Sequence, residues 1–153
     1  MVSDSLFSGI SDLSEDLSGP RAIDMLSDIG FNSVNLDYYP DDFAALKGKL
    51  EDDVLHNVAL IVFIGGTGIY YRDITTEAVQ SIIKKEIQGF GEEFRRRSYK
   101  QIGGKGLLSR AIAGITNKSV IVALPGSLNA AVTGIELLSE MIAHTLQLLR
   151  KEK

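Results

Sequence analysis

Apolar and polar residues follow patterns along the chain that predict helices and strands in turn. Apolar residues at helical spacing indicate a first helix that begins at Ser18-Gly19-Pro20 and ends at Gly30. A weak alternation over residues 34–38 suits a strand, and a second helix is expected from Asp41 to Val54. The continuous apolar run of residues 58–64 is typical of a central strand that is covered on both faces.

The second half of the chain continues the alternation. A third helix is expected from about Thr75 to Ile87, whereas the basic, glycine-containing segment 88–106 should be irregular apart from a short helix at residues 92–97. Two apolar runs, residues 111–116 and 119–124, could pair as a hairpin.

One long helix is expected at the end of the chain. After Pro125-Gly126-Ser127, an unbroken apolar stripe from Leu128 to Leu149 predicts a helix of roughly 35 Å, at a rise of 1.5 Å per residue. The order of strands and helices then predicts one domain over residues 1–153, an α/β fold built as a three-layer α/β/α sandwich with a mostly parallel central sheet.

The start of this predicted domain is unusual. An α/β domain normally opens with a complete buried strand, but only Met1-Val2 precede the polar Ser3-Asp4-Ser5. The first strand is therefore expected to be short or truncated. Ligands of such sheets bind beyond the carboxyl ends of the strands, and three segments satisfy that condition: Ser3-Asp4-Ser5, Gly65-Gly66-Thr67-Gly68 and Pro125-Gly126-Ser127.

Composition narrows the functional classes. The chain has 153 residues and a net charge of −4, so no general attraction to nucleic acid or to an anionic membrane is expected. The absence of cysteine excludes disulfides, zinc–thiolate sites and cysteine nucleophiles. The apolar run 58–64 is too short to cross a bilayer and no signal peptide is evident, so a cytoplasmic location is expected.

The glycine turn at residues 65–68 is the strongest local signal. Glycines at a strand end let backbone N–H groups converge on an anion, so phosphate binding and a tight turn with positive φ are equally good interpretations. The turn lacks both common nucleotide fingerprints. A dinucleotide motif would need glycine where Tyr71 stands, and Gly104-Lys105 is followed by Gly106 rather than by the Ser or Thr of a P-loop.

Two acidic positions lie near the predicted sheet edge. Asp73 follows the glycine turn, and Asp41 and Asp42 follow the second strand, so these carboxylates could share Mg²⁺ with a phosphate ligand. Aspartate is also a favoured residue at the start of a helix, so from the residues alone a helix cap is preferred for Asp73, and for Asp41 and Asp42 a cap at one of them and solvent exposure of the other.

Other candidate residues carry weaker signals. The basic residues of segment 95–110 could meet phosphates, but a solvated helix face is the commoner outcome and no nucleic acid partner is expected. His56 and His144 show no metal-ligand spacing, so no zinc site is expected. Tyr70 and Tyr71 could stack on a flat ring or simply pack as a loop.

Several short motifs occur in a defined order over nearly the whole chain. Together they resemble the MoaB/Mog-type molybdopterin adenylyltransferase family of molybdenum cofactor biosynthesis. Thr76, Gln88 and Leu128 stand where that family commonly has proline. The segments that carry the resemblance are Ser3-Asp4, Asp16 with Ser18-Gly19-Pro20, Gly65-Gly66-Thr67-Gly68, Arg72-Asp73-Ile74-Thr75, Gly89-Phe90-Gly91-Glu92, Leu108-Ser109-Arg110-Ala111, and Leu124-Pro125-Gly126-Ser127 with Asn129-Ala130.

The resemblance implies an activity and a site. Members adenylate molybdopterin with Mg²⁺ and ATP, release pyrophosphate, and usually form homo-trimers or hexamers. It implies that Asp73 and Asp41 are catalytic and hold Mg²⁺, and that the glycine turn cradles a phosphate. It also implies that molybdopterin and ATP are bound by Gly65, Gly66, Thr67, Gly68, Ser3, Asp4, Ser18, Gly19, Ser109, Pro125, Gly126, Ser127 and Asn129, with Ser109, Ser127 and Asn129 on the pterin side.

Three other functions stay open at this point. The chain could be a non-catalytic pterin- or nucleotide-binding protein of the same fold, which the abbreviated first strand would favour and the presence of Asp41 and Asp73 opposes. It could be a hydrolase related to the competence-damage proteins, although those are usually longer. It could also be an assembly protein that acts through its oligomer.

Overall fold

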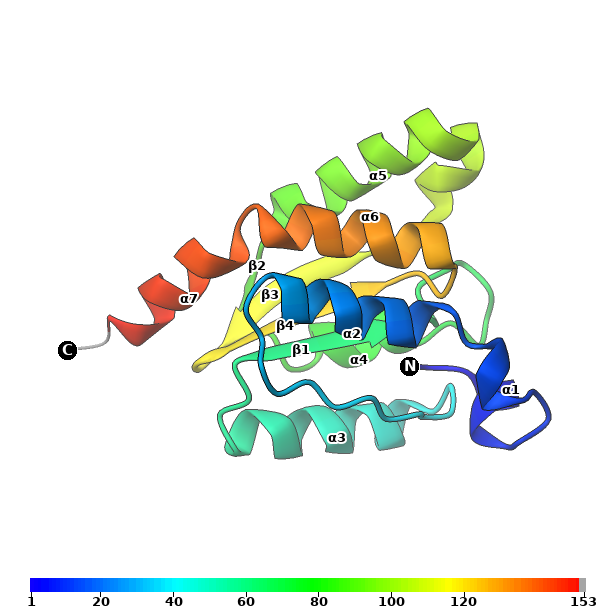
Figure 1. The fold of residues 1–153 in the computed structure, drawn as a ribbon, viewed down its shortest axis with the longest axis horizontal. Helices are drawn as coiled ribbons and strands as arrows, with labels where there is room; N and C mark the ends of the chain where they lie inside the picture. Colours follow the sequence, from blue (N-terminus) through cyan, green and yellow to red (C-terminus); the bar gives the residue numbers. More distant parts are fainter. Residues whose placement is uncertain (152–153) are drawn as a thin grey trace.

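A computed structural model describes residues 1–151, and within them four strands form one sheet in the order β1-β4-β3-β2 (Figure 1). β1 and β4 are parallel, whereas the pairs β4–β3 and β3–β2 are antiparallel. The sheet is therefore mixed, and the expectation of a mostly parallel sheet is corrected. The predicted hairpin is the reason: its two-residue turn, in which Asn117 has a φ of 48°, can only join antiparallel strands. The strands are β1 (Leu60–Ile64), β2 (Lys85–Glu86), β3 (Ile112–Thr116) and β4 (Ser119–Leu124).

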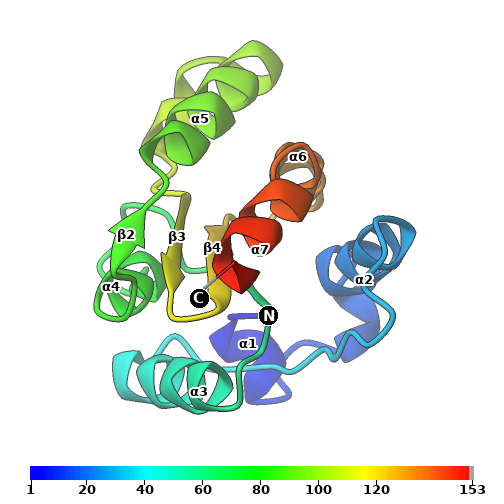
Figure 2. The same cartoon turned by 90° about the vertical axis from the view of Figure 1, so that its left-hand side faces the viewer.

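Helices cover both faces of the sheet, which confirms the predicted three-layer α/β sandwich (Figure 2). α2, α5, α6 and α7 pack on one face, and α3 and α4 pack on the other. β4 is fully buried and supplies both cores, because its alternate residues point to opposite faces. The helices are α1 (Asp4–Phe7), α2 (Ser18–Asp28), α3 (Phe43–Leu55), α4 (Thr75–Gln80), α5 (Gln88–Ile102), α6 (Leu128–Ser139) and α7 (Ile142–Arg150), with short 3-10 helices η1 (Leu13–Glu15) and η2 (Gly103–Leu108).

The amino-terminal strand is reduced to one bridge. Val2 pairs in parallel with Tyr39, and the Val2 N–H donates to the Ile64 carbonyl at 2.8 Å. A short first strand was expected and is confirmed. The strand expected at residues 34–38 is wrong: these residues pair with no other strand, and only the following Tyr39 forms a bridge, with Val2.

A hollow of about 220 Å³ follows the edge of β1 that faces α2 and residues 33–37. In a parallel pair, alternate residues of a strand bond to the same neighbour. Gly65 donates to Leu124 at 2.8 Å and Ala59 accepts from Val120 at 3.0 Å, so the odd-numbered residues of β1 face β4. The backbone groups of Leu60 and Val62 therefore point toward the hollow.

Two helices differ in length from the sequence prediction. α4 ends at Gln80 rather than near residue 87, because the chain turns there and the Lys84 N–H reaches the Ile115 carbonyl at 2.9 Å to begin β2. α5 is one continuous helix where an irregular segment was expected. Its buried residues Phe90, Phe94 and Ser98 recur every four positions along one face. Phe90 and Phe94 join the core on the sheet, and Ser98 lies against Gly106 of η2.

The predicted long last helix is also wrong, because it is broken between α6 and α7. The N–H groups of Glu140 and Met141 bond back three residues, to Leu137 and Leu138, and this tight turn redirects the chain. Figure 1 shows α7 leaving at an angle to α6.

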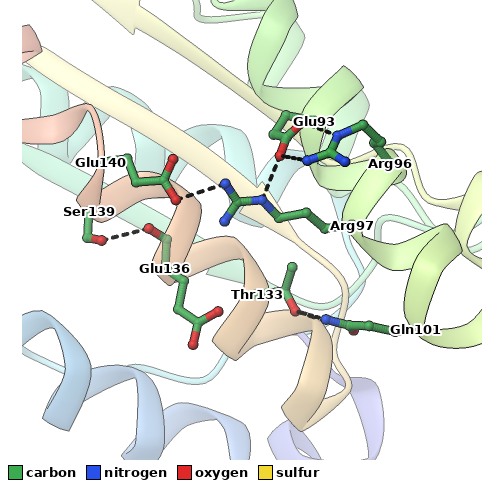
Figure 3. Close-up of polar contacts among 8 residues, drawn as sticks. All are labelled: Glu93, Arg96, Arg97, Gln101, Thr133, Glu136, Ser139 and Glu140. Carbon is green, nitrogen blue, oxygen red and sulfur yellow. Dashed lines mark hydrogen bonds and ion pairs between the residues drawn. The ribbon is translucent and has the colours of Figure 1, made fainter.

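Charged and polar side chains join α5 to the end of α6 (Figure 3). Arg97 donates to Glu140 at 2.8 Å, and the amide of Gln101 donates to Thr133 at 3.0 Å. Glu93 accepts hydrogen bonds from both Arg96 and Arg97. Much of the basic segment is therefore engaged with carboxylates on a helix surface. Within residues 1–151, no helix has the length and apolar character needed to cross a bilayer.

Candidate active site

The turns that follow β1 and β4 form one surface. Because the two strands are parallel, they end at the same side of the molecule, where α1 lies and α6 begins (Figure 1). A Cβ atom on Gly126 would lie 3.4 Å from the Cα of Gly65, so the glycine turn 65–68 touches the Pro125-Gly126-Ser127 turn. The structure thus brings these two turns together, and Ser3-Asp4-Ser5 lies at the same edge, because the Val2 carbonyl adjoins Gly65 and Asp4 bonds to Asp41.

The glycine turn adopts a backbone that other residues would strain. Gly65 and Gly66 have φ values of 113° and 66°. A Cβ on Gly65 would lie 2.1 Å from the Val2 carbonyl oxygen, and one on Gly66 would lie 2.2 Å from Oγ1 of Thr75. Both positions therefore require glycine for conformation and for space.

Two carboxylates lie against this turn. A Cβ on Gly66 would lie 2.8 Å from Oδ1 of Asp41, and one on Gly68 would lie 2.7 Å from Oδ2 of Asp73. Asp41 comes from the segment before α3, and Asp73 from the segment before α4. The two predicted catalytic residues therefore meet the same four-residue turn from different elements.

The interpretation as a helix cap holds for Asp42 but not for Asp41 or Asp73. Asp42 caps α3 by accepting the Ala45 N–H at 2.8 Å, which leaves the neighbouring Asp41 carboxylate uninvolved. Asp73 precedes Ile74, the N-cap residue of α4, and its Oδ2 accepts the Tyr70 N–H at 2.8 Å within the loop. Both carboxylates are available for another role.

Negative charge accumulates around Asp41. Partial burial is the main cause that raises the pKa of its carboxyl, and the nearby charges of Asp4 and Asp73 raise it further. A backbone interaction with Asp4 and the charge of Arg72 lower it. Asp4 accepts the Asp41 N–H at 2.8 Å and forms an ion pair with Arg72. A cation at this place would relieve the repulsion.

Ser3, Asp4 and Ser5 contact one another and the segments that carry Tyr39, Asp41 and Arg72. The Ser3 N–H donates to Tyr39 at 2.9 Å, and the Ser3 hydroxyl lies 3.1 Å from that of Ser5. Asp4 bonds to Asp41 and to Arg72, and so joins the segment before α3 to the loop that carries Asp73. The sequence predicted that Asp4 contacts the ligand instead. Ligand binding by Ser3 and Asp4 stays a prediction.

Ser18 and Gly19 lie behind the Pro125 turn. Both are buried, and both donate their N–H groups to Oδ1 of Asp16, at 2.9 and 3.0 Å. The Ser18 hydroxyl donates to the Gly126 carbonyl at 2.9 Å, which ties the start of α2 to the site.

The remaining predicted residues separate into two places. Ser127 and Asn129 are exposed at the start of α6, and the Ser127 hydroxyl makes no capping bond. Ser109 instead lines a hollow of about 380 Å³ with Thr76 and Arg95, and no residue of the glycine turn lines that hollow. The structure thus brings Ser127 and Asn129, but not the Ser109 side chain, to the surface formed by the two turns.

Sequence reasoning missed two residues of this site. Thr75 is fully buried against Gly66, and its Oγ1 has no hydrogen-bond partner among the described residues. Arg110 was grouped with the surface cations, but it bonds to Gly68 and Asp73. Thr75 belongs to the Arg72-Asp73-Ile74-Thr75 motif, which was a usable signal for it.

Helices cover both faces of the sheet, and the glycine turn and the Pro125 turn lie at the carboxyl ends of β1 and β4. These features are typical of three-layer α/β proteins that bind a ligand at that edge. The chain belongs to the family described as probable molybdopterin binding domain, which it matches over residues 1–144.

Named relatives and solved structures agree with this membership. A probable molybdopterin adenylyltransferase of Methanocaldococcus jannaschii is 45% identical over 113 residues, which is 73% of this chain and 69% of the relative. A molybdopterin adenylyltransferase of Pyrococcus furiosus is 39% identical over 137 residues, covering 87% of this chain and 80% of the relative. The crystal structure of the tungsten cofactor synthesizing protein MoaB from Pyrococcus furiosus superposes with a TM-score of 0.86 at 38% identity, covering 98% and 93% of the two chains.

Proposed function

We propose that this chain is a molybdopterin adenylyltransferase of molybdenum cofactor biosynthesis. It transfers the adenylyl group of ATP to the terminal phosphate of molybdopterin and releases pyrophosphate. The observation that carries the proposal is the convergence of Asp41 and Asp73 on the glycine turn. The names of the two relatives with 45% and 39% identity support it.

In this reaction the protein mainly has to position two anions that repel each other. A phosphate oxygen of molybdopterin attacks the α-phosphorus of ATP, and the bond from that phosphorus to the pyrophosphate oxygen breaks. Phosphoryl transfer of this kind depends on alignment and on neutralising charge more than on covalent chemistry by the protein. The backbone of Gly65, Gly66, Thr67 and Gly68 is suited to hold one phosphate without interference from side chains.

The residues present fit a magnesium ion. Mg²⁺ needs only one or two carboxylates when phosphate oxygens and water complete its coordination, and Asp41 and Asp73 meet that requirement. The pKa of Asp41 is raised mainly by partial burial and further by the charges of Asp4 and Asp73, so a cation bound here would favour the ionised carboxylate. The described residues contain no group of three or more potential metal ligands, so an all-protein metal cage is not proposed. Mg²⁺ bound here with ATP would neutralise charge on the phosphates.

Thr75 would act beside the carboxylates. Its buried Oγ1 lacks a partner and lies against Gly66, so a phosphate or metal-bound water at the turn would satisfy it.

Pterin recognition is assigned to the exposed side of the second turn. Ser127 and Asn129 present side chains at the start of α6, next to Pro125 and Gly126. Ser18 and Gly19 support this surface from behind through the Ser18–Gly126 bond. Ser3, Asp4 and Ser109 complete the proposed binding residues, with Ser109 reaching the ligand only if the pterin extends toward the neighbouring hollow.

The chain is further proposed to act as a homo-oligomer, a trimer or hexamer, in the cytoplasm. The arm formed by α5 and η2 exposes Tyr99, Ile102, Leu107 and Leu108, each more than half accessible. Apolar groups concentrated on one projecting element are typical of a subunit interface. Sedimentation at several protein concentrations would measure the assembly.

A second candidate function is binding of pterin without catalysis, because the exposed Ser127 and Asn129 could hold a pterin on the second turn without any reaction at the carboxylates. The test combines purified protein, molybdopterin and Mg²⁺-ATP, and follows pyrophosphate and adenylated pterin, with a parallel reaction that lacks molybdopterin. Pterin-dependent formation of both products supports the transferase. Pterin binding without either product supports the binding protein, and pyrophosphate release without pterin supports a hydrolase.

A further inference from the structure

Arg110 contacts both ends of the loop that carries Asp73. Its backbone N–H donates to the Thr67 carbonyl at 2.9 Å. Its guanidinium donates through Nε to the Gly68 carbonyl at 2.6 Å and through Nη2 to the Asp73 carbonyl at 2.7 Å. One side chain therefore joins the end of the glycine turn to the backbone of the candidate metal ligand.

The same residue anchors these segments to α4. The third guanidinium nitrogen forms an ion pair with Glu77, and the Arg110 carbonyl accepts the Thr76 hydroxyl at 3.0 Å. Thr76 is buried, so α4 provides a fixed base for Arg110. A planar guanidinium can serve three acceptors in fixed directions, whereas the single ammonium of lysine cannot match that arrangement.

The loop between the two anchored carbonyls is exposed. Ile69, Tyr70 and Tyr71 are each more than 60% accessible, so packing contributes little to holding the loop in place. The loop's internal bonds, from Tyr70 to the Asp73 carboxylate and from Asp73 to the Tyr70 carbonyl, fix its shape. The bonds from Arg110 fix where that shape sits relative to the glycine turn.

We propose that Arg110 is a positioning residue, which sets the placement of the Asp73 carboxylate over the glycine turn and thereby the metal affinity and turnover of the site. This inference rests on the proposed adenylyltransferase function. The role depends on geometry more than on charge, since two of the three guanidinium acceptors are backbone carbonyls.

Four variants of the full chain separate this role from others. Arg110→Lys keeps the positive charge but loses the planar set of N–H donors, and Arg110→Gln loses both the charge and that set of donors. Glu77→Gln removes the ion pair and keeps the carbonyl bonds. Arg96→Gln is the matched control, because Arg96 also pairs with a glutamate, Glu93 (Figure 3), but its side chain is exposed on α5 and contacts no residue of the glycine turn.

Three quantities are measured for each variant: the melting temperature, kcat and KM for pterin-dependent pyrophosphate release, and Mn²⁺ affinity by electron paramagnetic resonance without substrates. Both Arg110 variants should lower kcat by about 10- to 100-fold, as expected for a displaced catalytic group, and weaken Mn²⁺ binding. Glu77→Gln should lower kcat by about fivefold or less, in line with an exposed ion pair. Arg96→Gln should match the wild type within about twofold.

The inference is overturned if Arg110→Lys binds Mn²⁺ and turns over as the wild type does. It is also overturned if the variant only melts earlier while its kcat and Mn²⁺ affinity, measured well below the melting temperature, are normal. A wild type that binds Mn²⁺ but forms no product contradicts the proposed function, and the effect of Arg110 on Mn²⁺ affinity then still decides the positioning role. A wild type that neither binds Mn²⁺ nor turns over contradicts both.

Discussion

The carboxylate of Asp4 accepts the backbone N–H of Asp41 at 2.8 Å, and its other oxygen pairs with Arg72. Asp4 therefore links the segment that carries Asp41 to the loop that carries Asp73. It also raises the pKa of the Asp41 carboxyl through its charge. One side chain thus affects both the placement and the ionisation of a candidate metal ligand.

Replacing Asp4 with Asn should lower turnover without unfolding the protein. The amide can still accept the Asp41 N–H through its oxygen, but it loses the ion pair with Arg72. We expect kcat to fall by about tenfold, as for loss of a charged contact that orients a reactive group. The pKa of Asp41 should fall as well, which NMR titration of its carboxyl carbon would detect. Asp24→Asn, on the exposed side of α2, is the control, and equal kcat in the two variants would contradict the linking role.

Replacing Asp41 with Asn should raise the melting temperature at neutral pH while suppressing turnover. Burial and the neighbouring carboxylates raise the pKa of Asp41 in the folded protein. The folded state then binds its proton more readily than the unfolded state, so this group's contribution to stability falls as pH rises between the two pKa values. The advantage of the variant should be full near pH 7 and vanish below about pH 4, the ordinary pKa range of aspartate.

Thermal unfolding across that pH range, in metal-free buffer, is the measurement. Adding Mg²⁺ should then stabilise the wild type by mass action and leave Asp41→Asn nearly unchanged. A variant that melts below the wild type at pH 7 in metal-free buffer would contradict the unbalanced charge at Asp41.

Replacing Gly66 with Ala should damage both stability and activity. The new Cβ would sit 2.2 Å from Thr75 Oγ1 and 2.8 Å from Asp41 Oδ1, on a residue whose φ is 66°. A strained backbone of this kind costs about 1–3 kcal/mol in the free energy of unfolding. Urea unfolding would measure it beside Gly104→Ala, whose Cβ meets nothing within 4 Å. Equal stability of the two variants would show that the turn can relax.

An apolar peptide fused ahead of Met1 should stabilise the fold. The hollow of about 220 Å³ along β1 offers the free backbone groups of Leu60 and Val62. Burial also lowers the pKa of the Met1 ammonium, because it disfavours the charged form. The neutral amide of a fusion would not carry this buried charge. A fused run of alternating Val and Thr should raise the melting temperature by about 2–4 °C for each kcal/mol gained, whereas a Gly-Ser run should not. Equal melting temperatures would mean that the hollow does not accept a strand.

The sequence pattern predicted those strands whose residues are apolar over a continuous stretch. The continuous apolar run before Gly65 marked β1, and the two runs around Asn117 marked the hairpin. Asp41 and Asp73 converge as predicted although the strand at residues 34–38 does not form, because Val2 bridges Tyr39 and bonds to Ile64 at the end of β1. The antiparallel β3–β4 pair follows from the predicted hairpin, whereas the antiparallel pairing of β2 with β3 was not predicted, because it joins segments that are distant in the chain.

Other features depend on contacts between distant parts of the chain. α5 has few apolar residues, and it is held partly by Arg97 and Gln101, which bond to α6 and its end more than 30 positions away. Arg110 reaches Gly68 across 42 positions, so its sequence neighbours gave no sign of that contact. Asp41 and Asp42 are chemically identical, and only the structure shows that Asp42 is the cap.

The central claim is that Asp73, held over the glycine turn, is needed for adenylyl transfer. The most direct test compares pterin-dependent pyrophosphate release by the wild type, Asp73→Asn and Asp42→Asn, since Asn retains the acceptor oxygen in both loops. We predict that Asp42→Asn keeps the wild-type rate and that Asp73→Asn loses about 100-fold or more with an unchanged circular dichroism spectrum. A wild-type rate in Asp73→Asn would contradict the account.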